Sequence, residues 1–280
     1  MLGNAMALPW TVQAAIGFLV TAIAVWAAIR YRDRSLLFAT AVWGIEVGLL
    51  IGARGLLLGV PIAAPFGVKT YTYVLVPMAA GAIILSRRHW WTSAGFTAPS
   101  QWQRLRLLWL VALFFILPAF ALVHGVRWPW NLTLLLAGYV LLGTGLEEMF
   151  YRGIVLRATI AGGVLPAVLF TSLLFGASHV AGLATYPSIG VAYVGLQAWI
   201  GFLLGIFLAA IRLRMNAIWP AWAVHAGYDL PTILIYGPYA FRLQPTLTGA
   251  VESTVIGLIL AGIGLFLLRH AKPSILRFES

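Results

Sequence analysis

Residues 131–148 read NLTLLLAGYVLLGTGLEE, sixteen uncharged residues followed by two adjacent glutamates. A helix needs about 20 apolar residues to cross the roughly 30 Å hydrocarbon layer of a bilayer. The stretch therefore predicts a membrane helix that carries Glu147 and Glu148 within the membrane. Ionisable side chains at that depth cost several kcal/mol unless they are paired or hydrated, so each is a candidate functional residue.

The composition of the whole chain agrees with a membrane protein. Of its 280 residues, 62% are hydrophobic and only 9% are charged, whereas about a quarter of the residues in a soluble domain carry charge. Eight further apolar stretches are long enough to be membrane helices, at 11–29, 36–58, 70–86, 105–123, 164–179, 189–211, 217–236 and 247–268. The sequence predicts an all-α, polytopic membrane helical bundle of about eight or nine transmembrane helices.

The basic residues indicate an orientation. The chain has a net charge of +11, and 14 of its 18 Lys and Arg residues, Arg212 among them, fall in the loops and tail on one side of the predicted spans. Such an excess is typical of cytoplasmic loops. We expect the N-terminus outside and the C-terminus inside. The positive charge then marks topology, and it gives no support for a nucleic-acid partner.

Three regions are predicted along the chain. Residues 1–129 hold about four N-terminal helices and a basic, Trp-rich interfacial segment at 87–106, residues 130–236 form a catalytic core, and residues 237–280 form a last helix and a basic tail.

The spacings Gly48/Gly52 and Gly201/Gly205 are compatible with close helix packing. The absence of Cys excludes disulfides, thiolate metal sites and thiol nucleophiles.

Two glutamates and one arginine, Glu147, Glu148 and Arg152, form the first polar cluster. On a helix Glu148 and Arg152 are four residues apart, with the acid towards the N-terminus, which favours an ion pair. Glu147 is five residues from Arg152 and is rotated about 100° away on an α-helix. We therefore expect Glu148 and Arg152 to be a structural pair, and Glu147 to be free for proton transfer.

The second cluster is His225 and Asp229, again four residues apart on one helix face. Glu147 and His179 each lie 16 residues from Gly163, so a helical hairpin that turns there places both at the same depth, roughly 20 Å from the turn. His225 reaches about 16 Å on its own helix. The sequence predicts that three helices bring these side chains together. Glu46 and Arg54, which are also intramembrane, have no assigned role.

The polar residues match three motifs in order. Glu147-Glu148-x-x-x-Arg152, Phe175-x-x-x-His179 and His225-x-x-x-Asp229 resemble the EExxxR, FxxxH and HxxxN/D motifs of the type II CAAX prenyl endopeptidases and their prokaryotic relatives, the CPBP or abortive-infection family of intramembrane glutamic proteases. The resemblance covers roughly residues 130–235. It implies an intramembrane endopeptidase, without a cofactor, in a prokaryotic plasma (inner) membrane.

The resemblance also implies roles for these residues. Glu147 is the base that activates the attacking water, His179 helps to hold that water, and His225 with Asp229 stabilises the oxyanion, while Glu148, Arg152 and Phe175 support the site. Because a carboxylate cannot donate a hydrogen bond, Asp229 is expected to orient His225 instead. The implied partners are the lipid bilayer and a peptide or membrane-protein substrate, and the resemblance allows a substrate that is lipidated at its C-terminus.

Other functions are compatible with the same residues. His179, His225 and Glu147 are a plausible zinc ligand set for an intramembrane metalloprotease, although no HExxH motif is present. Intramembrane Glu, His and Asp also occur in ion-coupled transporters. A third alternative is a non-catalytic membrane protein with an immunity or regulatory role.

Overall fold

The computed structural model describes residues 9–59, 66–98, 108–123, 128–185, 190–236 and 246–269. In these ranges the chain forms helices joined by turns and contains no strand, so the predicted all-α class is confirmed. The helices are α1 (Trp10–Arg30), α2 (Ser35–Gly59), α3 (Phe66–Arg87), α4 (Leu108–Val123), α5 (Trp130–Glu148), α6 (Leu156–Thr159), α7 (Val164–Ser178), α8 (Ala181–Thr185), α9 (Val191–Met215), α10 (Trp219–Tyr236) and α11 (Leu247–Arg269). Each predicted apolar stretch coincides with one of the longer helices.

Six stretches of the described chain are long and apolar enough to cross a membrane. They are Trp10–Arg30, Ser35–Leu57, Trp130–Gly162, Val164–Leu183, Val191–Met215 and Leu247–Arg269. The helices α3, α4 and α10 also form, but they do not meet the same standard of length and apolar composition. The protein is an integral membrane protein. The count of eight or nine spans and the N-out orientation stay predictions.

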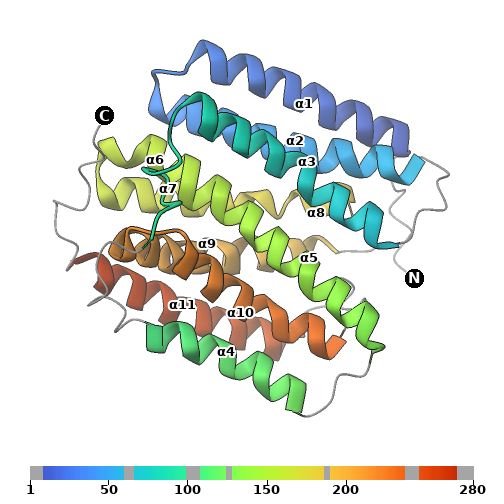
Figure 1. The fold of residues 1–280 in the computed structure, drawn as a ribbon, viewed down its shortest axis with the longest axis vertical. Helices are drawn as coiled ribbons and strands as arrows, with labels where there is room; N and C mark the ends of the chain where they lie inside the picture. The colour runs from blue at the N-terminus through green and yellow to red at the C-terminus, as the bar shows by residue number, and fades with distance from the viewer. Residues whose placement is uncertain are drawn as a thin grey trace.

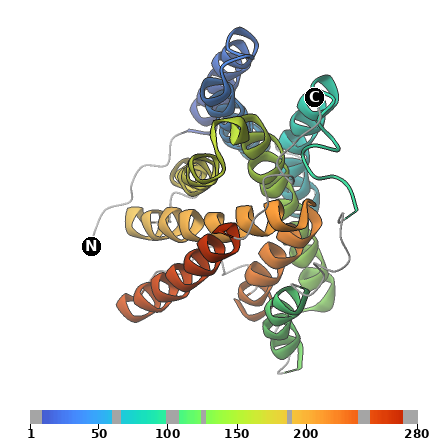
Figure 2. The same ribbon diagram turned by 90° about the vertical axis from the view of Figure 1, so that its left-hand side faces the viewer.

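The helices form two groups on either side of α5. In Figure 1, α1, α2 and α3 lie on one side and α9, α10, α11 and α4 on the other. The bridging helix α5 packs against α3 and against α10. Figure 2 shows the same separation from another side, with α1 and α2 at the top and α9, α10 and α11 below them, and α11 packs against α9. Because α5 contacts both groups, the residues at its C-terminal end are placed in the interior of the bundle.

Glycines allow the closest helix pairs to form. A Cβ atom at Gly48 of α2 would lie 2.8 Å from the carbonyl oxygen of Gly17 in α1. A Cβ atom at Gly205 of α9 would lie 2.8 Å from the Cβ of Ser172 in α7. Both distances are shorter than real Cβ contacts, so only glycine permits these approaches. The close packing predicted from the two glycine spacings is confirmed.

The connection from α5 to α7 contains a π-helical segment, η2 (Met149–Val155), followed by α6 and a short 3-10 turn, η3 (Ile160–Gly162). The chain reverses at Gly163, whose φ of 112° favours glycine because it has no Cβ. The predicted hairpin turn is therefore confirmed. All seven residues of η2 are buried, and this segment packs against α2, α3 and α7.

Arg212, which the sequence places among the cytoplasmic basic residues, is buried at the end of α9. Its guanidinium donates to the carbonyl oxygens of Ala94 at 3.1 Å and Ser93 at 3.0 Å. The turn at Gly95, with φ of 96°, places the guanidinium where a Cβ would otherwise lie. Arg212 thus anchors the described part of the basic segment, up to residue 98, to the end of α9. Residues 99–106 lie outside the described residues.

Candidate active site

The acidic pair at the end of α5 divides into a buried and an accessible carboxylate. Glu148 is buried, and its Oε1 atom lies 3.0 Å from Nη1 of Arg152, which is also buried. The predicted ion pair is confirmed. The rotation of about 100° between Glu147 and Arg152 is expected for an α-helix. The chain is instead π-helical from Met149 onwards and makes longer i→i+5 turns, so that angle does not apply. The two glutamates differ in exposure, since the side chain of Glu147 is 31% exposed and that of Glu148 is buried.

His225 of α10 connects to the same acidic pair. Its Nδ1 atom lies 2.9 Å from Oε1 of Glu148, and both side chains are buried. The Glu148 carboxylate therefore accepts from the imidazole on one helix and pairs with Arg152 on another segment. A buried carboxylate with two such partners fixes the orientation of the imidazole ring.

The other nitrogen of His225 faces two accessible carboxylates. The Nε2 atom lies 3.5 Å from Oε2 of Glu147 and 3.6 Å from Oδ2 of Asp229, whose side chain is 42% exposed. The structure thus brings Glu147, His225 and Asp229 together from α5 and α10. The ring has one nitrogen held in the protein interior and one nitrogen beside two partly exposed carboxylates.

His179 follows the last residue of α7, and Phe175 separates it from His225. The Phe175 ring meets the two imidazoles edge-on, with centroid separations of 5.4 Å to His179 and 5.5 Å to His225. The guanidinium of Arg152 lies 4.2 Å from the centre of the same ring. The carbonyl oxygen of Phe175 accepts from Nδ1 of His179 at 3.1 Å. Phe175 therefore holds both imidazoles, and Nε2 of His179 is left for other partners.

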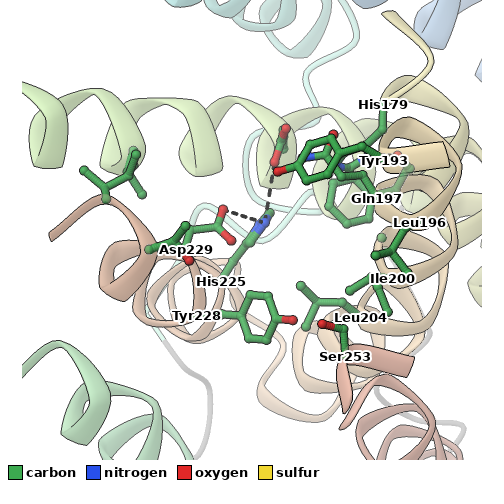
Figure 3. A pocket seen from close by; sticks show the side chains of 16 residues that line it. His179, Tyr193, Leu196, Gln197, Ile200, Leu204, His225, Tyr228, Asp229 and Ser253 are labelled. Atoms are coloured by element: carbon green, nitrogen blue, oxygen red, sulfur yellow. Dashed lines mark hydrogen bonds and ion pairs between the residues drawn. The ribbon is translucent and has the colours of Figure 1, made fainter. Parts of the chain in front are cut away.

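All four predicted catalytic residues line one cavity of about 340 Å³ (Figure 3). Figure 3 shows His179, His225 and Asp229 around a common space, with Tyr228 and Ser253 on the wall below them. The cavity is lined by Val140, Glu147, Phe175, His179, Tyr193, Leu196, Gln197, Ile200, Gly201, Leu204, His225, Tyr228, Asp229, Thr232, Ile233 and Ser253. Glu148 and Arg152 are not among them, so they can affect the cavity only through the residues that they hold.

Sequence reasoning missed several polar residues of this cavity. Tyr193 and Gln197 come from α9, Tyr228 from α10 and Ser253 from α11. Single hydroxyl and amide groups are common in membrane helices, so their presence alone does not mark a site. The available signal was that Tyr193 and Gln197 are four residues apart, as are residues on one face of a helix.

Two further observations concern Glu46 and Arg54, to which the sequence assigns no role, and the alternative of a zinc site. Glu46 of α2 is only 1% exposed, and Arg54 lies two turns further along α2 and is partly buried. Within the described ranges, no group of three or more His, Asp and Glu side chains is arranged to hold a metal ion.

Comparison with known protein families supplies a match over the region that holds the site. Residues 128–231 match the family model described as type II CAAX prenyl endopeptidase Rce1-like. The range includes all three polar motifs, from Glu147 to Asp229. No curated protein and no solved structure matches the chain. The family match implies a protease, and hence a hydrolase, within an integral membrane protein.

Proposed function

We propose, from the match of residues 128–231 to the type II CAAX prenyl endopeptidases, that this protein is an intramembrane endopeptidase with a glutamate base. The observation that carries the proposal is the position of Glu147. Its Oε2 atom is 3.5 Å from Nε2 of His225, and both residues line the cavity that His179 also lines. A carboxylate and two imidazoles around one accessible space are the groups needed to activate water and to stabilise an oxyanion.

In the proposed reaction, Glu147 takes a proton from a water molecule as the water oxygen attacks the carbonyl carbon of the peptide bond. The carbonyl π electrons move to oxygen and form a tetrahedral oxyanion. The protonated Glu147 then donates its proton to the departing amine nitrogen as the C–N bond breaks. The products are a carboxylic acid and an amine, and Glu147 returns to its carboxylate form.

The two imidazoles have separate tasks in this scheme. With its Nδ1 hydrogen directed to the Phe175 carbonyl oxygen, His179 offers the Nε2 lone pair to the attacking water. His225, when protonated, donates from Nε2 to the oxyanion, since its Nδ1 is held by Glu148. Asp229 lies 3.6 Å from that same Nε2, so its carboxylate accepts from Nε2 and orients the ring until the oxyanion forms and takes over that hydrogen bond.

The substrate class follows from the family and from the cavity. A CAAX-type protease implies a peptide substrate at the membrane, and the cavity combines aliphatic side chains with tyrosine, glutamine and serine. We propose an extended peptide segment whose backbone meets the polar groups. A lipid group at its C-terminus would lie against the aliphatic side chains.

The experiment compares membranes that contain the wild type with membranes that contain Glu147→Gln, and it identifies peptide termini by mass spectrometry. The proposal predicts termini that are present with the wild type and absent with Glu147→Gln. Glu252→Gln is the control, because Glu252 is an exposed carboxylate on α11 that does not line the cavity. Identical termini in wild-type and Glu147→Gln membranes contradict the proposal.

The zinc alternative requires a separate test on the purified protein. The glutamate mechanism predicts that a metal chelator leaves cleavage of the identified substrate unchanged. Loss of cleavage that added Zn²⁺ restores would contradict that mechanism and support the metalloprotease.

A further inference from the structure

A buried carboxyl group lies behind the proposed site, on a helix outside the matched domain. Glu46 belongs to α2 and is 1% exposed, whereas the family match begins at residue 128. Helix α2 packs against η2 and α7, which carry Arg152 and Phe175. A carboxyl group is among the most costly groups to bury in a membrane helix, so its position requires a compensating interaction.

The hydroxyl of Tyr151, on the η2 segment that packs against α2, is the group that can supply this interaction. The Glu46 carboxyl and the Tyr151 hydroxyl lie close enough to interact, and Tyr151 is completely buried. Neither group has a hydrogen bond of normal geometry with any described residue. Because buried polar groups are nearly always hydrogen-bonded, a carboxyl acceptor that faces a hydroxyl donor is a complementary pair.

Tyr151 connects this pair to the proposed site. Its ring lies 5.1 Å from the ring of Phe175, which separates the two imidazoles. Next in the chain is Arg152, the partner of Glu148. Neither Glu46 nor Tyr151 lines the cavity, so both can act on a substrate only through other residues.

We propose that Glu46 is a positioning residue of this site, which accepts the hydrogen bond of the Tyr151 hydroxyl and thereby holds η2 and the Phe175 ring in register with the imidazoles. The inference rests on the proposed protease function. It gives helix α2, which lies outside the matched residues 128–231, a supporting part in catalysis.

The test measures kcat and KM for Glu46→Leu, Glu46→Gln, Tyr151→Phe and the double variant Glu46→Leu/Tyr151→Phe, on the peptide found with the wild type. Glu46→Leu and Tyr151→Phe should each lower kcat at least tenfold and change KM less than twofold, because neither residue lines the cavity. Glu46→Gln keeps an acceptor oxygen and should retain kcat within threefold. The double variant should be no slower than the slower single variant, since both remove one interaction.

The control is Glu252→Leu, the same substitution at an exposed position of α11, which should leave kcat unchanged. A wild-type kcat in Glu46→Leu overturns the inference, and so does a change that is confined to KM. The inference is also overturned if Glu46→Gln lowers kcat as much as Glu46→Leu does. It is overturned as well if the reductions in kcat of the two single variants multiply in the double variant. If Glu46→Leu does not fold, the near-isosteric Glu46→Gln and Tyr151→Phe decide. Cleavage that survives in Glu147→Gln instead contradicts the protease mechanism itself.

Discussion

The carboxylate of Glu148 at the end of α5 accepts a 2.9 Å hydrogen bond from the imidazole of His225 in α10. The same oxygen lies 3.0 Å from the guanidinium of Arg152. One buried oxygen therefore joins the two helices that carry the proposed base and the proposed oxyanion donor. This oxygen has a structural role, because all three side chains are withdrawn from solvent.

Removal of this carboxylate should destabilise the protein. Glu148→Ala leaves the guanidinium of Arg152 buried without its partner, which we expect to cost about 3 to 5 kcal/mol in the free energy of unfolding. The measurement is unfolding by heat or denaturant in detergent. Glu252→Ala, at an exposed position on α11, should leave the unfolding midpoint unchanged. Equal midpoints for the two variants would argue against a structural role for Glu148.

Helix α9 lies close to the His179 ring at Gly201, so we expect a larger residue at this position to lower the rate of catalysis. A Cβ atom at Gly201 would lie 3.0 Å from Cε1 and 3.2 Å from Nδ1 of His179, so Gly201→Ala must displace the ring by a few tenths of an ångström. We expect kcat to fall about tenfold. Gly195→Ala is the matched control on the same helix, because a Cβ atom there meets nothing within 4 Å. Equal kcat values for the two variants would show that the position of His179 is not critical.

The role of Asp229 is tested by two substitutions. If Asp229 orients His225 by accepting from Nε2, Asp229→Asn keeps an acceptor oxygen and should retain kcat within about tenfold. Asp229→Ala removes the acceptor, and we expect its kcat to fall about a hundredfold. The comparison requires only initial rates at saturating substrate. Indistinguishable rates for Asp229→Ala and the wild type would exclude the orienting role.

The fold follows from sequence because the membrane restricts it so strongly. A stretch such as 247–268 must be helical in hydrocarbon, where every backbone polar group needs an internal partner, and α11 is found at Leu247–Arg269. The shared depth of Glu147 and His179 followed from equal distances to Gly163, and both line one cavity. These predictions need only helix geometry and a turn.

Other features depend on packing that no local pattern encodes. The π-helical turn at Met149–Val155 lies in a sequence that reads as ordinary helix. The bond from His225 to Glu148 joins residues 77 positions apart, and the sequence suggested only the pair of Glu148 with Arg152. Arg212 reads as a loop cation, yet its burial depends on the carbonyl groups of a distant turn. Tertiary contacts decide each of these cases.

The central claim is that Glu147 is the base for peptide hydrolysis. The most direct measurement is the initial rate of cleavage of the identified peptide by purified wild type and Glu147→Gln in proteoliposomes, with unfolding midpoints to verify folding. Loss of a general base predicts a rate at least about a hundredfold lower for Glu147→Gln, and Glu252→Gln should match the wild type. A folded Glu147→Gln variant that cleaves the peptide at the wild-type rate would contradict the claim. If no proteolysis is found and Glu147→Gln abolishes the uptake of a solute, the result would favour a transporter instead.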